Sequence, residues 1–427
     1  MSPLSRRHFL RLLGASSATL LAGCVSAPAI ISGSKNHRVV IIGGGFGGAT
    51  AAKYLRLANP EAQITLVERD TFFIACTSSN QVLAGIKDFT FLSQSYSKLS
   101  FNYNIRIANH TATGIDAQAR KVELSSGEKL DYDRLILTPG IDFRWEAIQG
   151  YDLAAAQNSP HAWIAGAQTL QLRKQLEAMS DGGLVIIAVP AGHYRAATAP
   201  YERAAMMAYY LKREKPRSKI IVLDSKEDFP QRDLFVQGWN KLYPGMIEWV
   251  PAGKGGRITE FNNGTVRTEL ASFKPEVANI IPPQQAAAIA HLAGLTDNSG
   301  WCPVNPLTFE STLQPGIHII GDSCIADDMP KTASAANSQA KICASAVAAL
   351  LDGGKAEEPA YINIGYTQLS PDYGFSAVDF YQLQNGRITR QAMGGGSTPL
   401  NASAEQLASE AYYADGWYRN IIADSFS

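Results

Sequence analysis

The feature that most constrains the fold is a glycine-rich turn between a buried strand and a helix. Residues 39–42 form a continuous apolar run, which is typical of a buried parallel strand, and the turn 43–48 has the pattern G-x-G-x-x-G. We expect a helix over residues 49–58 and a second strand over residues 64–67. A strand, a glycine turn, a helix and a strand in this order predict a unit that binds a dinucleotide.

Each glycine of this turn has a physical role. Gly43 permits the tight turn, Gly45 lets the backbone approach a pyrophosphate, and Gly48 lets the helix pack close to the strand. The helix N-terminus offers free N–H groups to the anion, and an acid at the end of the second strand binds a ribose hydroxyl. The predicted cofactor-binding residues of this unit are Gly43, Gly45, Phe46, Gly48, Glu68 and Arg69.

Two later segments indicate which dinucleotide is bound. One buried strand ends in Thr138, Pro139 and Gly140, and another ends in Gly321 and Asp322. In flavoproteins with two dinucleotide domains, these segments match the exit from the FAD domain and the aspartate that binds the ribityl chain. Together with the first turn, they favour FAD over NAD as the cofactor.

A second strand–helix–strand pattern has lost its glycine turn. Strands are expected at residues 183–188 and 220–224, with a helix over residues 201–212. The turn at residues 189–195 holds a single glycine, a proline and bulky side chains. Since proline removes a backbone donor and large side chains keep a pyrophosphate away, we expect this domain to bind no NAD(P)H. The flavin would then receive its electrons from another source.

The beginning of the chain has the pattern of an export signal. Two arginines within residues 5–10 precede an uncharged stretch, which predicts export by the twin-arginine route and a periplasmic location. Two alternatives remain open for its end. The sequence Leu-Ala-Gly-Cys ending at Cys24 resembles a lipobox, whereas the small residues Ala27 and Ala29 fit ordinary cleavage. Contact with a membrane is expected only through a lipid on Cys24.

Seven segments carry a resemblance to a known family, at residues 48–54, 160–163, 200–204, 281–284, 300–304, 329–331 and 336–339. In them the chain resembles the flavoprotein subunit of flavocytochrome c sulfide dehydrogenase, within the sulfide:quinone oxidoreductase and disulfide-reductase-like group. The resemblance implies an α/β fold with two dinucleotide-binding, Rossmann-like domains of the disulfide-reductase type and a C-terminal α+β domain. A length of 427 residues suits two or three domains.

We expect five parts along the chain. They are an export signal and linker at 1–36, a first FAD-binding segment at 37–150, a degenerate NAD(P)-type domain at 151–285, a second FAD-binding segment at 286–350 and a C-terminal interface domain at 351–427.

The resemblance also implies a covalent flavin and a redox-active disulfide. The family tethers its flavin to a cysteine at the position of Cys76, for which a small buried residue is the alternative. The positions of the disulfide are Ala196 and Gly365 here, and neither residue offers the electrophilic sulfur that sulfide attacks. The sequence therefore departs from the family at the step that uses sulfide.

Two weaker catalytic candidates remain. Glu202 resembles a family acid and is either a general base or a carboxylate at a helix N-terminus. Lys331 either places positive charge near the reduced flavin or is solvated. Three further cysteines, Cys302, Cys324 and Cys343, are interpreted as structural.

The expected activity is FAD-dependent oxidation of sulfide or another small reduced sulfur compound. Electrons would pass to a c-type cytochrome subunit or a soluble cytochrome c, and because the chain lacks C-x-x-C-H, the haem must lie on the partner. A membrane-associated dehydrogenase that reduces quinone and a non-catalytic electron relay are the alternatives. A formal net charge of zero argues against a nucleic-acid partner, and the sequence contains no metal-ligand cluster.

Overall fold

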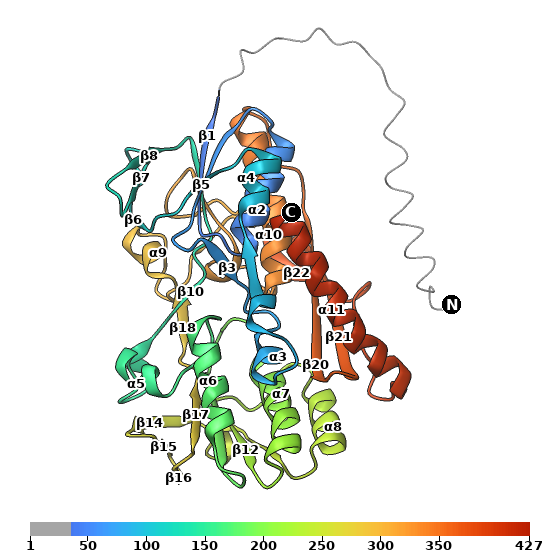
Figure 1. Cartoon of the computed structure of the whole chain (residues 1–427). Coiled ribbons are helices and arrows are strands. Elements are labelled where there is room, and N and C mark those ends of the chain that lie inside the picture. Colours follow the sequence, from blue (N-terminus) through green and yellow to red (C-terminus); the bar gives the residue numbers. More distant parts are fainter. Residues whose placement is uncertain (1–35) are drawn as a thin grey trace. The chain divides into compact units, whose positions relative to one another are not determined.

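Two parallel sheets form the frame on which the rest of the chain packs (Figure 1). The computed structural model describes residues 36–427, so the predicted export signal and Cys24 lie outside the described residues. The first sheet has the strand order β19-β9-β1-β2-β5. Its strands are β1 (Arg38–Ile42), β2 (Gln63–Val67), β5 (Arg106–Ala108), β9 (Arg134–Leu137) and β19 (Ile317–Ile319).

The first sheet explains the apolar run at the start of the dinucleotide unit. β1 is the central strand and pairs in parallel with β2 on one side and β9 on the other. Because helices cover a parallel sheet on both faces, all four residues from Val39 to Ile42 are buried. Helix α2 (Phe46–Ala58) begins at Phe46, three residues earlier than predicted. It starts there because Gly45 has the extended conformation of an N-cap residue.

The second sheet has the order β13-β12-β11-β17, again parallel throughout. Its strands are β11 (Leu184–Val189), β12 (Lys219–Asp224), β13 (Ile247–Val250) and β17 (Val277–Ile280). Helix α7 (Ala199–Glu214) follows β11 and carries Pro200 in its first turn, where the missing N–H costs nothing. It is longer at both ends than predicted.

The C-terminal part consists of an antiparallel sheet and two long helices. These elements are β20 (Ala360–Ser370), β21 (Tyr373–Gln384), β22 (Arg387–Arg390), β23 (Gly396–Ser397), α10 (Ala333–Leu351) and α11 (Ala404–Phe426). Helix α11 packs against β20, β21 and α2, and Figure 1 shows it in red beside the sheet. The architecture matches the predicted fold class. The domain boundaries stay predictions, because residues 36–427 form one compact unit.

Shorter elements connect these parts. The strands are β3 (Phe72–Ile74), β4 (Ser93–Ser95), β6 (Ala112–Asp116), β7 (Lys121–Leu124), β8 (Lys129–Asp131), β10 (Ile141–Phe143), β14 (Ile258–Asn262), β15 (Thr265–Thr268), β16 (Ser272–Phe273) and β18 (Gln284–Ala286). The helices are α3 (Ser79–Leu83), α4 (Ser97–Tyr103), α5 (Leu153–Asn158), α6 (Ala167–Ala178), α8 (Arg232–Leu242) and α9 (Ala288–Leu292), with short 3-10 turns η1 (Phe89–Leu92), η2 (Trp145–Ala147), η3 (Ala252–Lys254) and η4 (Gly321–Ser323). Among residues 36–427, no helix is long and apolar enough to cross a membrane.

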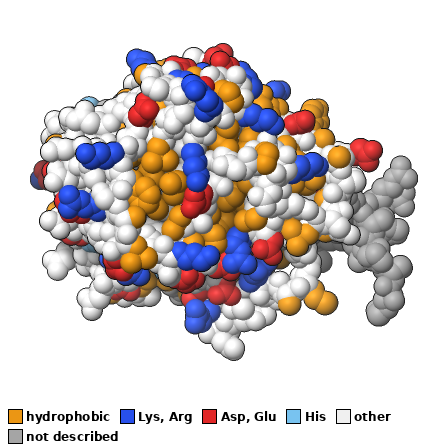
Figure 2. Space-filling view, turned by 90° about the horizontal axis from the view of Figure 1, so that it is seen from below, with side chains coloured by type: hydrophobic (Ala, Val, Ile, Leu, Met, Phe, Trp, Pro, Cys, Tyr) orange, Lys and Arg blue, Asp and Glu red, His pale blue; other side chains and the backbone are white. Residues whose placement is uncertain are grey.

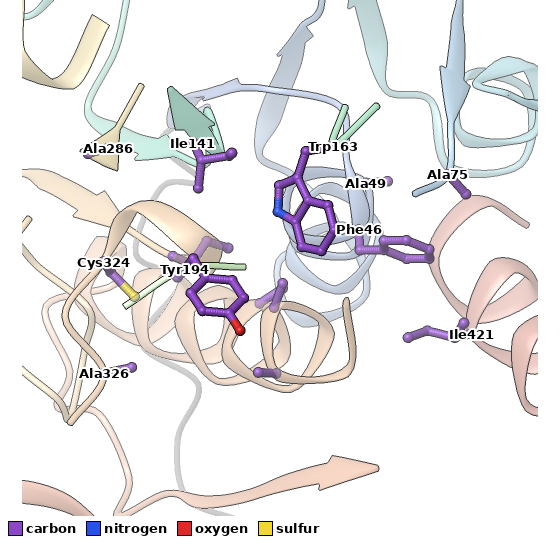
Figure 3. Close-up of a cluster of buried hydrophobic side chains, with 14 of the residues drawn as sticks. Phe46, Ala49, Ala75, Ile141, Trp163, Tyr194, Ala286, Cys324, Ala326 and Ile421 are labelled. Carbon is purple, nitrogen blue, oxygen red and sulfur yellow. The ribbon is translucent and has the colours of Figure 1, made fainter. Parts of the chain in front are cut away.

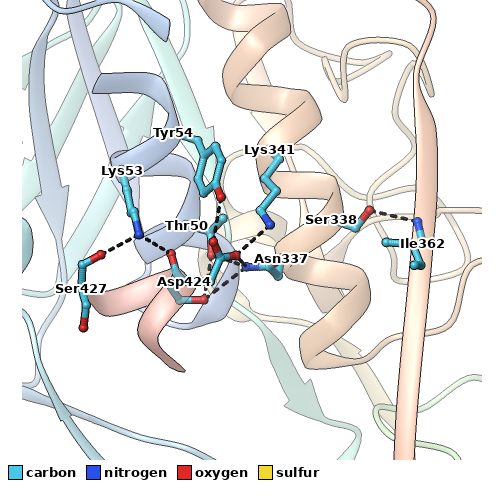
Figure 4. Close-up of polar contacts among 10 residues, drawn as sticks. Thr50, Lys53, Tyr54, Asn337, Ser338, Lys341, Ile362, Asp424 and Ser427 are labelled. Carbon is cyan, nitrogen blue, oxygen red and sulfur yellow. Dashed lines mark hydrogen bonds and ion pairs between the residues drawn. The ribbon is translucent and has the colours of Figure 1, made fainter. Parts of the chain in front are cut away.

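The end of α11 joins the first dinucleotide helix through polar and aromatic contacts. Asp424 accepts a hydrogen bond from Tyr54 of α2 at 2.7 Å and pairs with Lys341 of α10 at 2.7 Å (Figure 4). Lys53 of α2 donates to the backbone oxygen of Asp424 at 3.0 Å. Phe426 contacts Phe46 with a ring separation of 6.0 Å. Segments more than 350 residues apart in the sequence therefore brace the same helix.

Hydrophobic side chains from all parts meet in one buried cluster. Figure 3 shows Phe46 of α2, Trp163, Tyr194 and Ile421 of α11 within it. Because the cluster includes side chains from both parallel sheets and from the C-terminal part, it fixes the positions of these parts around the site described next.

Candidate functional site

A cavity of about 690 Å³ lies along the turn after β1. Most of the residues predicted from the sequence line it, namely Gly43, Gly45, Phe46, Glu68, Arg69, Cys76, Thr138, Pro139, Gly140, Ala196, Glu202, Gly321, Asp322 and Gly365. Gly48 and Lys331 are not among the lining residues. The fold thus brings residues from six separate stretches of the sequence, at 43–46, 68–76, 138–140, 196–202, 321–322 and 365, to one site.

The three glycines of the turn have different physical reasons to be glycine. Gly43 has φ +98°, and a Cβ there would lie 2.3 Å from the backbone oxygen of Thr138. A Cβ on Gly48 would lie 1.8 Å from the backbone oxygen of Gly43, so this residue serves the close packing of helix on strand. A Cβ on Gly45 would meet nothing closer than the Phe73 ring at 3.5 Å, which is ordinary contact. The open space beside Gly45 fits a pyrophosphate that approaches the backbone.

Glu68 braces the turn as well as lining the cavity. Its Oε2 accepts from the backbone N–H of Gly44 at 2.7 Å, and its Oε1 accepts from that of Asp70 at 3.1 Å. Each carboxylate oxygen keeps a lone pair that a ribose hydroxyl can use. Arg69 is exposed and pairs with Asp70 at 3.4 Å, so its charge is directed along the rim of the cavity.

Asp322 lies at the other end of the site in a buried and positively charged environment. Its Oδ2 lies 3.7 Å from Nη1 of Arg195, a residue that the sequence did not single out as a site residue. Burial raises the pKa of Asp322, whereas Arg195 and Lys331 act in the opposite direction. Gly321 has φ +75° and donates its N–H to Gln339, which orients the Asp322 side chain beside the cavity.

In the cavity wall, the Cys76 side chain contacts the backbone of the segment that carries Trp163. The Cys76 sulfur accepts from the backbone N–H of Ala165 at 3.4 Å, and the thiol contacts the backbone oxygen of Trp163 at 3.7 Å. The indole Nε1 of Trp163 is buried and has no hydrogen-bond partner among the described residues. A buried donor without a partner is costly, so this atom fits a ligand that supplies an acceptor.

A buried arginine, Arg203, was missed by the sequence reasoning. Its guanidinium donates to the backbone oxygens of His161 and Ala162 at 2.9 and 2.7 Å and to Oδ1 of Asn80 at 3.0 Å, and it lies 5.0 Å from the Trp163 ring centroid. Burial lowers its pKa to about 10. Its hydrogen-bond partners are neutral groups, so its positive charge is available to the cavity.

Glu202 is the carboxyl group next to this cation. It accepts from Asn80 at 2.8 Å and from the backbone N–H of Gln368 at 3.0 Å. Burial raises the pKa of Glu202, and the two hydrogen bonds and Arg203 oppose that shift. A raised pKa suits a group that exchanges a proton with a substrate near neutral pH.

The other catalytic candidate lies outside the large cavity. The Lys331 ammonium donates to the backbone oxygens of Asp322 and Cys324, both at 2.7 Å, and lies 3.9 Å from the Trp301 ring centroid. Lys331 is therefore neither a lining residue of the large cavity nor solvated. Among the described cysteines, Cys76 alone lines that cavity, while Cys302 and Cys324 are buried free thiols whose pKa burial raises to about 12.

Ala196 and Gly365 both line the cavity, from the segment before α7 and from β20. Ala196 has φ +55°, a backbone region that alanine rarely adopts. A Cβ on Gly365 would meet no atom within 4 Å, so space is open there. The two positions that the resemblance assigns to the disulfide thus line the same cavity, and neither residue carries sulfur.

The second sheet also has an acid at the place where a nucleotide ribose would bind, but protein donors already occupy its carboxylate. Asp224 ends β12 and is fully buried. Its carboxylate accepts from Tyr201 at 2.5 Å, from Trp249 at 3.0 Å and from Lys226 at 2.6 Å. Because three protein donors occupy this acid, the packing is consistent with the prediction that the domain binds no NAD(P)H.

The two doubly wound sheets and the glycine turn at residues 43–48 define a flavoprotein of the disulfide-reductase type. Family models match this chain at residues 37–179 (pyridine nucleotide-disulphide oxidoreductase), 169–282 (sulfide dehydrogenase [flavocytochrome c] flavoprotein chain, central) and 357–426 (flavocytochrome c sulphide dehydrogenase, flavin-binding). The chain belongs to the flavoprotein-chain family of flavocytochrome c sulfide dehydrogenase, a family of FAD-dependent oxidoreductases. The cofactor of the large cavity is FAD.

Individual relatives agree with this assignment. The chain is 58% identical over 45 residues to the sulfide dehydrogenase [flavocytochrome c] flavoprotein chain of Chlorobaculum thiosulfatiphilum, covering 10% of this chain and 94% of that one. It is 31% identical over 184 residues to the sulfide-quinone reductase of Aquifex aeolicus, covering 43% of this chain and 41% of that one.

Solved structures confirm the predicted fold class. The sulfide:quinone oxidoreductase of Aquifex aeolicus superposes with a TM-score of 0.71 at 18% identity, covering 91% of this chain and 92% of that one. Putidaredoxin reductase in its covalent complex with putidaredoxin superposes with a TM-score of 0.64 at 18% identity, covering 90% and 94%.

Proposed function

We propose that this protein oxidises sulfide or another small reduced sulfur compound at bound FAD and passes the electrons to a c-type cytochrome. The observation that carries the proposal is that one cavity is lined both by the glycine turn at residues 43–48 and by two neighbouring charged residues, Glu202 and Arg203. The family assignment supports the class of reaction, since the two sequence relatives reported above are, by their names, a sulfide-quinone reductase and a sulfide dehydrogenase flavoprotein chain.

Each part of the cavity has a role in holding the cofactor. The turn at Gly45 and the N-terminus of α2 hold the pyrophosphate, Glu68 holds a ribose hydroxyl, and Asp322 holds the ribityl chain. Cys76 lines the same cavity and would carry the thioether tether to the flavin. Bound FAD supplies an acceptor for two electrons at a time.

The residues around Glu202 manage protons and charge. The Glu202 carboxylate takes a proton from a thiol or hydrosulfide as electrons leave the sulfur, and Asn80 keeps the carboxyl group in place. The nearby Arg203 guanidinium favours an anionic sulfur species over a neutral one. Because neither Ala196 nor Gly365 provides a disulfide, the sulfur compound must approach the flavin directly.

The electron acceptor and the location are proposed from sequence motifs. We propose that the protein is exported to the periplasm by the twin-arginine route and donates to a cytochrome subunit or a soluble cytochrome c, because the chain lacks a haem-attachment motif. Figure 2 shows a face on which hydrophobic side chains are interspersed with basic and acidic ones. Neither sign of charge prevails on this face. Such a mixed surface suits a protein partner better than a nucleic acid.

A quinone is the second candidate acceptor. The specific observation in its favour is the likeness to the sulfide:quinone oxidoreductase of Aquifex aeolicus over 91% of this chain. A lipid on Cys24 would hold the protein at a membrane that contains quinone.

The test is an anaerobic titration of the purified flavoprotein with sulfide, polysulfide, thiosulfate and NADH, followed at the flavin absorption band. We expect bleaching by at least one sulfur compound and none by NADH. Reoxidation is then measured with cytochrome c and with a soluble quinone, and faster reoxidation by the quinone would select the second candidate. A flavin that no sulfur compound bleaches would refute the proposal and favour a relay.

A further inference from the structure

The segment before α7 separates two cavities. Residues Arg195, Ala196, Thr198 and Ala199 line the large flavin cavity. Residues Gly192, His193, Tyr194 and Ala197 of the same segment line a second cavity of about 200 Å³. The partition between the cavities is therefore one chain thick, and its side chains at residues 196 and 197 are methyl groups.

Hydrogen bonds hold this partition in place. The backbone N–H of Ala196 donates to the backbone oxygen of Lys331 at 2.8 Å. The hydroxyl of Tyr194 donates to the backbone oxygen of Ala197 at 3.0 Å, and Figure 3 shows the Tyr194 ring beside the segment that carries Cys324 and Ala326. Since the backbone is tied on both sides, a larger side chain at residue 197 would extend into the second cavity.

The far wall of the second cavity consists of Trp301, Ile325, Ala326, Met329 and Lys331, with Asp327 and Pro330. Its volume is several times the ~30 Å³ that one water occupies in the liquid, so it has room for a molecule of a few heavy atoms. Indole, thioether and alkyl groups make up most of this wall. Such polarizable groups suit a soft ligand such as a sulfur or halide anion.

The charges around the second cavity favour an anion. Lys331 contributes a buried ammonium group whose contacts are two backbone oxygens and the Trp301 ring. Among the described residues, no carboxylate lies within ion-pair distance of this ammonium. The Asp327 carboxylate is already neutralised by Arg387 at 3.1 Å and by the backbone N–H of Ile388 at 2.9 Å. The Asp322 carboxylate acts electrostatically on Lys331, but it lines the large cavity and lies 3.7 Å from Arg195. Of the two charged groups that line the second cavity, Lys331 is therefore the one without an ion-pair partner among the described residues.

We propose that the second cavity binds a small reduced-sulfur anion, hydrosulfide or a short persulfide, beside Lys331 and delivers it past Ala196 and Ala197 to the flavin. This inference rests on the proposed function for the identity of the ligand, while the anion site itself does not depend on turnover. Ala196, one of the two positions that the resemblance assigns to the family disulfide, takes part here only as a small side chain of the partition.

The first experiment tests the anion site without turnover. Crystals of the flavin-loaded protein are soaked in sodium bromide, and anomalous scattering locates the bound ions. We expect a bromide in the second cavity in contact with the Lys331 ammonium, and none there in Lys331→Met or Ala197→Leu. Bromide that binds only elsewhere, or that persists in this cavity in both variants, would overturn the proposal whether or not sulfide is the substrate.

The second experiment tests the route. In stopped-flow measurements, Ala197→Leu should slow flavin reduction by sulfide roughly tenfold or more, because the larger side chain would occupy the second cavity and exclude the anion from it. Ala293→Leu is the matched control, a half-buried alanine after α9 that lines neither cavity, and it should reduce at the parent rate. Reoxidation of chemically reduced flavin should be the same in all three proteins. A parent rate in Ala197→Leu would refute the route. A parent protein that sulfide does not reduce would refute the proposed function, and the bromide result would still decide the anion site.

Discussion

The sharpest prediction separates a glycine required by the cofactor from a glycine required by the fold. Gly45 has φ −72° and ψ −167°, which alanine adopts without strain, and its new Cβ would meet only the Phe73 ring at 3.5 Å. We therefore expect Gly45→Ala to change the stability of the flavin-free protein by less than ~1 kcal/mol, since alanine has less freedom when unfolded but is a poorer N-cap than glycine. The same Cβ occupies the space in which a pyrophosphate approaches the backbone.

Gly48→Ala provides the contrast within the same turn. Its Cβ would lie 1.8 Å from the Gly43 backbone oxygen, and because both atoms belong to rigid backbone, the helix must move. An overpacked site of this kind costs about 1–3 kcal/mol or more, so the flavin-free Gly48→Ala protein should unfold at clearly lower denaturant. Gly45→Ala should instead lose the stabilisation by FAD, about 2.7 kcal/mol at a hundredfold excess over the dissociation constant.

The assay compares both variants in a Cys76→Ser background, so that the flavin is not retained by a tether and can be removed and returned. Denaturant unfolding is recorded without and with FAD, and bound flavin is measured by absorbance after gel filtration. If flavin-free Gly45→Ala is as unstable as Gly48→Ala, or if it binds FAD like its parent, the assignment of the pyrophosphate to this turn is wrong.

Three further predictions concern the cavity and the blocked second site. Acid denaturation should release free flavin from Cys76→Ala and leave it on the unchanged chain; flavin released from both would reject the tether. Burial raises the pKa of Glu202, and its carboxylate accepts a proton only when ionised, so flavin reduction should accelerate as the pH rises through that raised pKa. Glu202→Gln should lower the rate and remove this pH dependence, and a profile identical to the parent's would exclude Glu202 as the base. Asp224→Ala leaves the half-buried Lys226 ammonium without its carboxylate and should lower the free energy of unfolding by roughly 3 kcal/mol in chemical denaturation. The variant should still show no reduction of the flavin by NADH. A change under about 1 kcal/mol would mean that this pair is not structurally important.

The dinucleotide unit could be predicted because its evidence is local. An apolar strand, a glycine turn and an acid lie within about 30 residues, and each follows from backbone geometry. Only the start of the helix was misplaced, since a G-x-G-x-x-G turn overlaps the first helical turn at Phe46. The loss of the second glycine turn was equally visible in the sequence.

The missed residues owe their positions to contacts between distant segments. Arg203 is a site residue because Asn80, His161 and Asn279 converge on it from other elements, and an arginine in a helix is ordinarily exposed. A charged residue next to the predicted Glu202 was the only available signal. The surroundings of Lys331 could not be predicted for the same reason, because nothing in its local sequence indicates its contact with the Trp301 ring.

The contact between α11 and α2 has a consequence for biosynthesis. When a ribosome has made only the first 400 residues, the whole glycine turn at residues 43–48 has been synthesised. At that point Tyr54 and Lys341 still lack Asp424, which joins them, and Phe46 lacks its contact with the Phe426 ring. Loading of FAD should therefore wait for translation of α11 to finish. A chain interrupted before that helix would remain colourless, and the colour of a preparation would report on the completeness of its polypeptide.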